Sequence, residues 1–334
     1  MQTRKLGDTG LSLSEISFGG AGIGNLYRPV ERADAIATLA AAWDAGIRYF
    51  DTAPFYGHGL SERRTGDFLQ SKPRADFVIS TKVGRILRPS PDGPPTDTGY
   101  VEALPFSINY DYSYDGIMRS HEDSLARLGL PSVDILYVHD LESGSFDTDE
   151  QYQAHLETFA TSGIRALEEL KAAGKISAYG LGVNEVSACI NVMERVRLDC
   201  LLMAGRYSLL DRSATGRLMK MCEDSGTMMI VGGVFNSGIM ATGAKPGATF
   251  NYTEAAPDIM DKVRAMEAVV RDYDVPLAQA ALHFPLRNPV VASVLIGTAK
   301  PSSLTRNMDL FAGSVPDTIW PALDDLALPA EFEE

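Results

Sequence analysis

Short apolar runs alternate with helical patterns eight times along the chain, and this alternation restricts the possible fold more than any other feature. The runs are rich in β-branched and aromatic residues, which is typical of strands buried in a parallel sheet. Eight strand–helix units predict an α/β fold, a closed (β/α)8 TIM barrel. The predicted strands are Ile16–Phe18, Ile47–Asp51, Phe77–Lys82, Val133–His139, Ala178–Val183, Cys200–Met203, Thr227–Val231 and Ser293–Ile296.

The pattern runs without a linker-like change in composition, so residues 1–334 are predicted to form one domain. Residues 3–16 alternate around Gly7-Asp8-Thr9-Gly10, which predicts a β-hairpin ahead of the barrel. Helices are expected near residues 31–45, 61–70, 114–128, 186–196 and 212–225, before Gly174, between 258 and 286, and after Pro301.

Two stretches are longer than ordinary connections: residues 84–109, rich in Pro and Gly, and residues 141–152. Long ordered loops are uncommon and usually functional. Both begin where a predicted strand ends, so we expect them to lie over the C-terminal face of the barrel. The first is predicted to be a substrate lid and the second a partial cover.

Composition argues against several functions. The net charge is −14, so there is no basic surplus to bind nucleic acid. No run of 18 apolar residues and no cleavable leader is visible, so we expect a cytoplasmic protein that does not bind membranes, either a monomer or a small homo-oligomer. Three cysteines without CxxC spacing, and no metal-ligand spacing among His and carboxylates, predict neither disulfides nor a metal site.

Four chemically active side chains stand at or just beyond the ends of three successive predicted strands: Asp51, Tyr56, Lys82 and His139. A buried carboxylate, ammonium or imidazole is costly unless such groups meet, and the strand ends of a barrel meet at one face. Taken singly, Asp51 with Lys82 could be a structural ion pair and His139 a core histidine. Together they predict an active site.

These residue types suit proton transfer. The ordinary tyrosine pKa of about 10 is too high for acid–base work at neutral pH, and a neighbouring Lys82 ammonium is expected to lower it. Asp51 would orient Lys82, and a neutral His139 would hold the substrate oxygen beside Tyr56. No nucleophile motif is present, so the relay predicts hydride transfer at a carbon that bears oxygen, with a nicotinamide cofactor.

A dinucleotide-binding βαβ unit is the competing interpretation, because a strand leads into Gly19-Gly20-Ala21-Gly22-Ile23-Gly24 and the next strand ends in Asp51. The glycines do not fit GxGxxG, since Asn25 stands where the last glycine belongs. Residues 25–30 also separate the loop from the helix, so the helix N-terminus would not face a pyrophosphate. The barrel is preferred.

The sequence resembles the aldo-keto reductase superfamily over essentially its whole length. The tetrad of that family falls on Asp51, Tyr56, Lys82 and His139, and the resemblance implies NAD or NADP bound in extended form across the barrel mouth. The matching stretches are Phe50–Gly57, Ser80–Lys82, Ser124–Gly129, Tyr137–His139, Gly180–Asn184 and Ser237-Gly238.

The resemblance also implies cofactor contacts: Asn184 at the carboxamide, Ser237 and Gly238 at the pyrophosphate, Thr298, Ser303 and Asn307 at the adenosine end, and Gly22 and Asp51 besides. Ser303 and Asn307 could instead have no contact with a cofactor and serve as an ordinary helix N-cap and as polar residues on the helix surface. The sequence departs from the family at two positions. Gly232 replaces the aromatic residue that stacks on the nicotinamide, and Ala204 replaces an amide-binding Gln, so Phe235 is a candidate to cover the ring.

Cofactor preference depends on cations near the 2′-phosphate of NADP. Gly297 and Ser303 occupy positions where NADP-specific members carry Lys or Arg, which leaves only Lys300 and Arg306 nearby. NAD is therefore expected, with NADP possible.

The resemblance is strongest to members that oxidise cyclic hemiacetals to lactones, with D-threo-aldoses such as L-fucose and L-galactose, or pyridoxal, as the small-molecule substrate. Tyr56 would then act as proton acceptor. A generic NADPH-dependent aldehyde or ketone reductase and a catalytically weak, cofactor-sensing barrel protein are the alternatives. The segments that carry this resemblance are Ala21–Tyr27, Ser61–Arg64, Phe106-Ser107, Asp111–Ser113 and Val138–Asp140.

Overall fold

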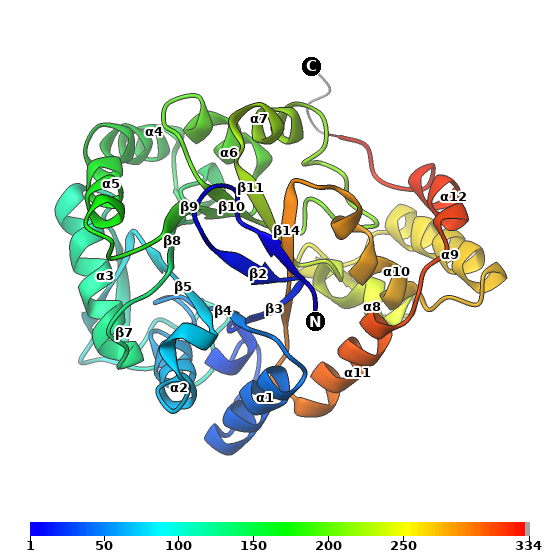
Figure 1. The fold of residues 1–334 in the computed structure, drawn as a ribbon, viewed down its shortest axis with the longest axis horizontal. Coiled ribbons are helices and arrows are strands. Elements are labelled where there is room, and N and C mark those ends of the chain that lie inside the picture. Colours follow the sequence, from blue (N-terminus) through cyan, green and yellow to red (C-terminus); the bar gives the residue numbers. More distant parts are fainter. Residues whose placement is uncertain (331–334) are drawn as a thin grey trace.

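A computed structural model describes residues 1–330 of the chain. Eight parallel strands close into a barrel, in which each strand pairs with its neighbour and the last pairs with the first (Figure 1). The predicted (β/α)8 barrel is confirmed. In barrel order the strands are β3 (Ile16–Gly19), β4 (Tyr49–Asp51), β5 (Val78–Val83), β8 (Ile135–His139), β9 (Ala178–Val183), β10 (Cys200–Ala204), β11 (Met228–Gly232) and β14 (Val291–Gly297).

Helices surround the barrel (Figure 1). Local signals explain several of their ends: the Ser113 hydroxyl caps α3 by accepting from the Gly116 N–H, and Gly129 ends it with a φ of 63°. The helix predicted from residue 212 begins at Arg217, because Gly216 adopts a φ of 72° that no helix accommodates. The helices are α1 (Arg32–Asp44), α2 (Leu60–Leu69), α3 (Tyr114–Leu128), α4 (Asp149–Thr158), α5 (Ile164–Ala172), α6 (Val186–Met193), α7 (Arg217–Ser225), α8 (Ile239–Thr242), α9 (Pro257–Asp272), α10 (Leu277–His283), α11 (Pro301–Ala312) and α12 (Trp320–Asp324).

The apolar core has two parts. The larger part lies between the strands and the surrounding helices, and the smaller part fills the barrel interior. The predicted N-terminal hairpin is confirmed as β1 (Thr3–Lys5) and β2 (Ser12–Ser14), which crosses one end of the barrel in Figure 1. Its fully buried Leu6 and Leu13 belong to the interior part of the core and close that end of the barrel. An active site can therefore form only at the opposite, C-terminal end of the strands.

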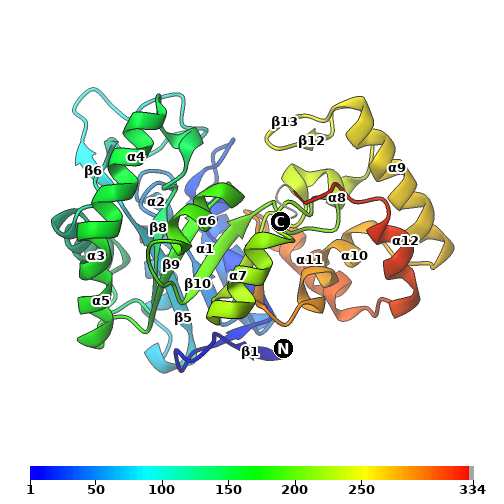
Figure 2. The same cartoon turned by 90° about the horizontal axis from the view of Figure 1, so that it is seen from above.

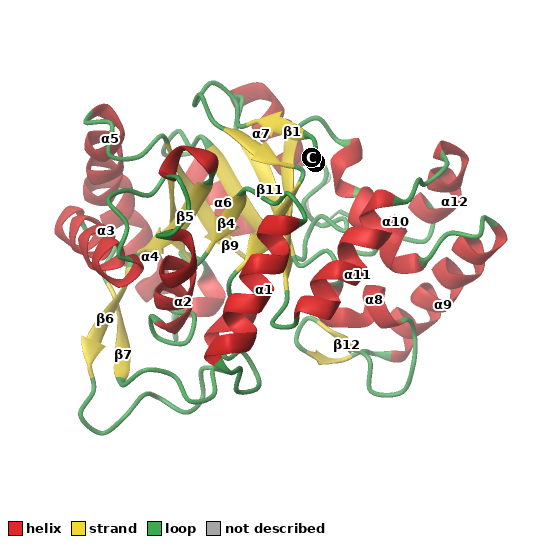
Figure 3. Cartoon of the chain, turned by 60° about the horizontal axis from the view of Figure 1, so that its bottom comes forward, coloured by secondary structure: helices red, strands yellow, loops and turns green. Residues whose placement is uncertain are grey.

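The long stretch at residues 84–109 is more ordered than predicted. Its ends pair as an antiparallel hairpin, β6 (Arg85–Pro89) with β7 (Phe106–Tyr110), which projects from the barrel in Figure 3. The second stretch holds a 3-10 turn, Ser143–Ser145, and the first residues of α4. The pair β12 (Thr249–Phe250) and β13 (Thr253–Glu254) was not predicted. Figure 2 places β6 and the β12–β13 hairpin at the end opposite β1, around the barrel mouth.

The cysteines Cys189, Cys200 and Cys222 are buried and free. Within residues 1–330, no helix has the length and apolar character needed to cross a bilayer.

Candidate active site

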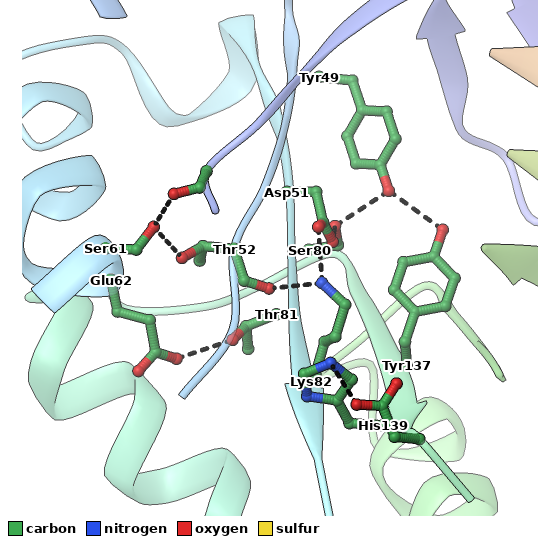
Figure 4. Close-up of polar contacts among 12 residues, drawn as sticks. Tyr49, Asp51, Thr52, Ser61, Glu62, Ser80, Thr81, Lys82, Tyr137 and His139 are labelled. Carbon is green, nitrogen blue, oxygen red and sulfur yellow. Dashed lines mark hydrogen bonds and ion pairs between the residues drawn. The ribbon is translucent and has the colours of Figure 1, made fainter. Parts of the chain in front are cut away.

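The loops that carry the site are held by the first turns of α2. Ser61 Oγ donates to the Gly20 carbonyl at 2.8 Å and lies 2.8 Å from the Thr52 hydroxyl (Figure 4). Only glycine can occupy residue 20 beside Ser61, because a Cβ there would lie 2.6 Å from Ser61 Oγ. Arg64 donates to the carbonyls of Ile23 and Val30. The polar residues of this turn therefore fix the loops after β3 and β4.

Lys82 and Asp51 form a buried ion pair. Lys82 Nζ lies 2.6 Å from Asp51 Oδ2 and donates to the Thr52 carbonyl at 3.0 Å (Figure 4). The Ser80 hydroxyl donates to Asp51 Oδ1 at 2.7 Å and is bonded in turn to the Tyr49 hydroxyl. Burial raises the pKa of Asp51, and Lys82 and Ser80 oppose that rise. Asp51 thus holds Lys82 in one position, as the sequence predicts.

Tyr56 lies close to both Lys82 and His139. Lys82 Nζ is 4.6 Å from the centre of the Tyr56 ring, and the Tyr56 and His139 rings meet edge to face at 5.9 Å. Burial, aided by the Asp51 carboxylate, raises the pKa of Tyr56 well above 10. The predicted lowering by Lys82 is therefore wrong for the protein alone, since the ammonium is bonded to Asp51 and Thr52 and desolvation of the phenolate dominates.

His139, the last residue of β8, is neutral. Burial, with the nearby cations Arg85 and Lys82, lowers its pKa well below the usual value. Its Nε2 lies 3.5 Å from Asp140 Oδ2, and the same oxygen pairs with Arg85 at 2.6 Å. The sequence interpretation assigned no role to Asp140 or Arg85, although Asp140 directly follows His139 and Arg85 lies three residues beyond Lys82, the predicted end of its strand.

A cavity of about 320 Å³ opens at this mouth, a size at the small end of the range for ligand pockets. Tyr56, Lys82 and His139 line it, and Asp51 lies behind Lys82. The three strand ends and the turn after β4 are therefore brought together as predicted. Its other walls include aromatic side chains from loops (Tyr27, Phe55, Tyr100 and Tyr252) and small or polar residues (Ala21, Asp140, Gly182, Asn184 and Ala204).

Asn184, predicted to bind the carboxamide, lies in this cavity and is oriented by Glu142. The Glu142 carboxylate accepts from Asn184 Nδ2 at 2.9 Å and from the Asn184 and Glu185 backbone N–H groups. No hydrogen bond to Asn184 Oδ1 is found within residues 1–330, so this oxygen can accept from a bound amide. Glu142 is a positioning residue that the sequence interpretation missed.

Glu142 predicts a specific pH dependence of stability. Burial, with the Asp140 carboxylate, raises its pKa to about 7 from an ordinary 4.5. The folded state therefore binds more protons than the unfolded state between these values, and stability falls as the pH rises through this window. From about pH 5 to 8 the free energy of unfolding should decrease more in the wild type than in Glu142→Gln. Urea unfolding at several pH values measures this, and parallel curves would contradict it.

The predicted adenosine-end residues lie along neighbouring segments. A Cβ at Gly22 would approach the Thr298 carbonyl carbon to 3.1 Å, so the loops after β3 and β14 touch. Ser303 and Asn307 follow on α11, where Asn307 helps to line a separate cavity of about 290 Å³ beside α8. Ser303 is not an N-cap, because Lys300 occupies that position.

Ser237 and Gly238 form the turn that leads into α8, with φ values of 59° and 111°. Ser237 Oγ accepts from the backbone N–H of Tyr252, which ties the β12–β13 hairpin to this turn. Phe235, the candidate to cover the nicotinamide ring, packs against the barrel core, whereas Tyr252 lines the cavity. Tyr252 is therefore the better placed aromatic residue.

A (β/α)8 barrel with a phenol, an ammonium, a carboxylate and an imidazole gathered at its mouth defines a class of barrel oxidoreductases. The pattern of the Aldo/keto reductase family matches residues 15–327, and the chain belongs to that family. It is an oxidoreductase that acts on alcohol or carbonyl groups, and its family uses nicotinamide cofactors.

Two relatives match nearly the whole chain. Pyridoxal 4-dehydrogenase of Microbacterium luteolum is 43% identical over 96% of both chains. D-threo-aldose 1-dehydrogenase of a Pseudomonas species is 38% identical over 96% of this chain and 95% of its own. Among solved structures, an aldo-keto reductase from Bacillus halodurans in its holo form has a TM-score of 0.76 at 24% identity, covering 100% of this chain and 99% of its own, which supports the fold.

The cavity wall suits a planar ring. The small residues Gly182 and Ala204 line it, and a Cβ at Gly232 would meet no atom closer than 3.9 Å, so space remains beside Ala204. With Asn184 Oδ1 at its edge, this wall fits a nicotinamide and its carboxamide.

Proposed function

We propose that the protein oxidises a cyclic hemiacetal, an aldose of the L-fucose type or pyridoxal, to its lactone with a nicotinamide cofactor. The observation that carries the proposal is that Tyr56, Lys82 and His139 line one small cavity. The names of the two relatives support the substrate class, since a pyridoxal hemiacetal and an aldose both present a C–H and an O–H at the reacting carbon.

In this reaction the hemiacetal hydroxyl loses its proton to Tyr56, the C–H bond breaks, and the C–O bond of that hydroxyl becomes the C=O bond of the lactone. The nicotinamide, when bound, accepts the hydride with its two electrons. His139 is neutral, so an N–H of its ring holds the substrate oxygen by donation. Lys82, fixed by Asp51, places a positive charge beside the phenol, where it favours the phenolate that forms as the proton leaves.

NAD is the proposed cofactor, with NADP as the weaker one. Lys300 and Arg306 are both exposed near the predicted adenosine end, so neither is held in a preformed phosphate site. We assign the contacts of the cofactor to Gly22, Asp51, Asn184, Ser237, Gly238, Thr298, Ser303 and Asn307.

Steady-state assays test the proposal. The protein is incubated with L-fucose, L-galactose, D-arabinose or pyridoxal and with NAD or NADP, and the reduced cofactor is followed by absorbance. We expect turnover on at least one hemiacetal, with a higher kcat/KM for NAD. Reduction of simple aldehydes by NADPH without hemiacetal oxidation would indicate a generic reductase, and cofactor binding without turnover would indicate a sensing role.

A further inference from the structure

Asp140 presents a carboxylate to the cavity in an unusual backbone conformation. Its φ is 47°, in the left-handed region that non-glycine residues rarely adopt. Asp140 lines the cavity beside His139, and its side chain is 13% exposed. Strained residues of this kind persist where the surroundings fix them, and they gather at functional sites.

Three contacts hold this conformation. The Tyr112 hydroxyl donates to the carbonyls of His139 and Asp140 at 2.8 and 3.3 Å, and the Asp140 N–H donates to the Gly182 carbonyl at 2.9 Å. Tyr112 reaches this position because Gly84 lacks a side chain, since a Cβ there would lie 2.3 Å from the Tyr112 ring. The backbone around Asp140 is therefore fixed before any ligand arrives.

Arg85 fixes the carboxylate itself. The Arg85–Asp140 pair measures 2.6 Å, and the guanidinium stacks 4.2 Å from the centre of the Phe55 ring. A buried ion pair contributes little to stability compared with apolar residues of the same size, so stability does not account for it. Asp140 Oδ2 pairs with Arg85 and lies 3.5 Å from His139 Nε2. Among residues 1–330, no hydrogen bond to Oδ1 is found, and Asp140 lines the cavity, so this oxygen can accept from a molecule bound there.

We propose that Asp140 determines substrate specificity by accepting a hydrogen bond from a hydroxyl group next to the reacting carbon of the substrate. The inference rests on the proposed function and limits the expected substrates to those that carry such a hydroxyl group. A carboxylate forms a stronger bond to such a donor than a neutral acceptor does. A substrate without the hydroxyl leaves a desolvated carboxylate oxygen unpaired, so the site rejects it.

The test compares substrates that differ by one hydroxyl. One arm uses L-fucose and its 2-deoxy analogue, and the other uses pyridoxal and its analogue without the phenolic hydroxyl. The wild type should favour the hydroxylated member in kcat/KM by about 100-fold in at least one arm. The arm with the larger preference identifies which hydroxyl is bound.

Two variants remove the carboxylate without straining the backbone at residue 140, because Asn and Gly both tolerate a positive φ. Asp140→Asn should lower the preference about tenfold, and Asp140→Gly should remove most of it. In both variants kcat/KM for the deoxy substrate should fall less than that for the hydroxylated substrate, because the deoxy substrate never forms the hydrogen bond to Asp140, and circular dichroism checks that each variant is folded. Asp149→Asn, at an exposed acid of α4, is the charge-matched control and should leave the preference unchanged.

An equal loss on both substrates would mean that Asp140 acts only through the structure, and the inference would fail. A wild type without preference for the hydroxyl would overturn it as well. If no hemiacetal is oxidised, the proposed function fails, and the same ratio is then measured for reduction of glyceraldehyde against propanal. A loss of that preference in Asp140→Gly would still support the role of Asp140, and an unchanged ratio would overturn it.

Discussion

Tyr56→Phe is expected to lower kcat for hemiacetal oxidation by about 10³-fold, within the range for loss of a general acid or base. The variant removes the only phenol hydroxyl that the proposal uses for proton transfer, while the ring and its contacts with Lys82 and His139 remain. Its dissociation constant for NAD, measured by fluorescence titration, should change less than about twofold, because the proton acceptor is needed for chemistry and not for binding.

The raised pKa of Tyr56 adds a pH signature to this prediction. Oxidation needs the phenolate form, so kcat/KM of the wild type should rise with pH across the neutral and alkaline range, and the residual rate of Tyr56→Phe should lack this rise. Tyr100→Phe is the matched control, since Tyr100 lines the same cavity and its ring lies 6.1 Å from that of Tyr56. An equal loss of kcat in both variants would show that Tyr56 has no special part in proton transfer.

Asp51→Asn is expected to destabilise the protein by about 3–5 kcal/mol, because it leaves the Lys82 ammonium buried without its carboxylate. The side chain of Lys82 is 2% exposed, so water cannot replace the lost partner. The double variant Asp51→Asn/Lys82→Met removes both charges and should recover most of this loss, since the neutral pair carries no unpaired charge. Urea unfolding of the wild type, both single variants and the double variant measures the coupling.

Activity and stability should separate in this series. The double variant regains stability but lacks the positive charge beside Tyr56, so its kcat should stay near that of the less active single variant. A loss of stability below about 1 kcal/mol in Asp51→Asn would mean that the pair is solvated and not buried as described. Recovery of activity in the double variant would show that Lys82 serves the fold alone.

The sequence was sufficient to predict the barrel and the place where four side chains meet. Each barrel strand is a short apolar run, and in a closed parallel barrel the carboxyl ends share one face, so Asp51, Lys82 and His139 had to converge. Tyr56 follows from its position in the short turn after Asp51. Topology alone determines these placements, and no side-chain detail is needed.

The remaining features depend on contacts between residues far apart in the chain. The β6–β7 hairpin could not be predicted, because a long Pro- and Gly-rich segment separates its two strands. Arg85 belongs to this hairpin, and Tyr112 fixes the backbone at residues 139–140, so the Arg85–Asp140 pair depends on both. The direction of the Tyr56 pKa shift depends on how deeply the phenol is buried, and composition does not report that burial. Tyr252 reaches the cavity from a hairpin of two-residue strands, too short to show periodicity.

The most direct test of hydride transfer at this mouth uses L-fucose and pyridoxal carrying deuterium at the hemiacetal carbon, with NAD and NADP in separate reactions. We expect the deuterium to appear in the reduced nicotinamide in the same amount as the lactone formed, and Tyr56→Phe to lower both together. Reduced cofactor without lactone, or lactone without deuterium in the cofactor, would contradict it.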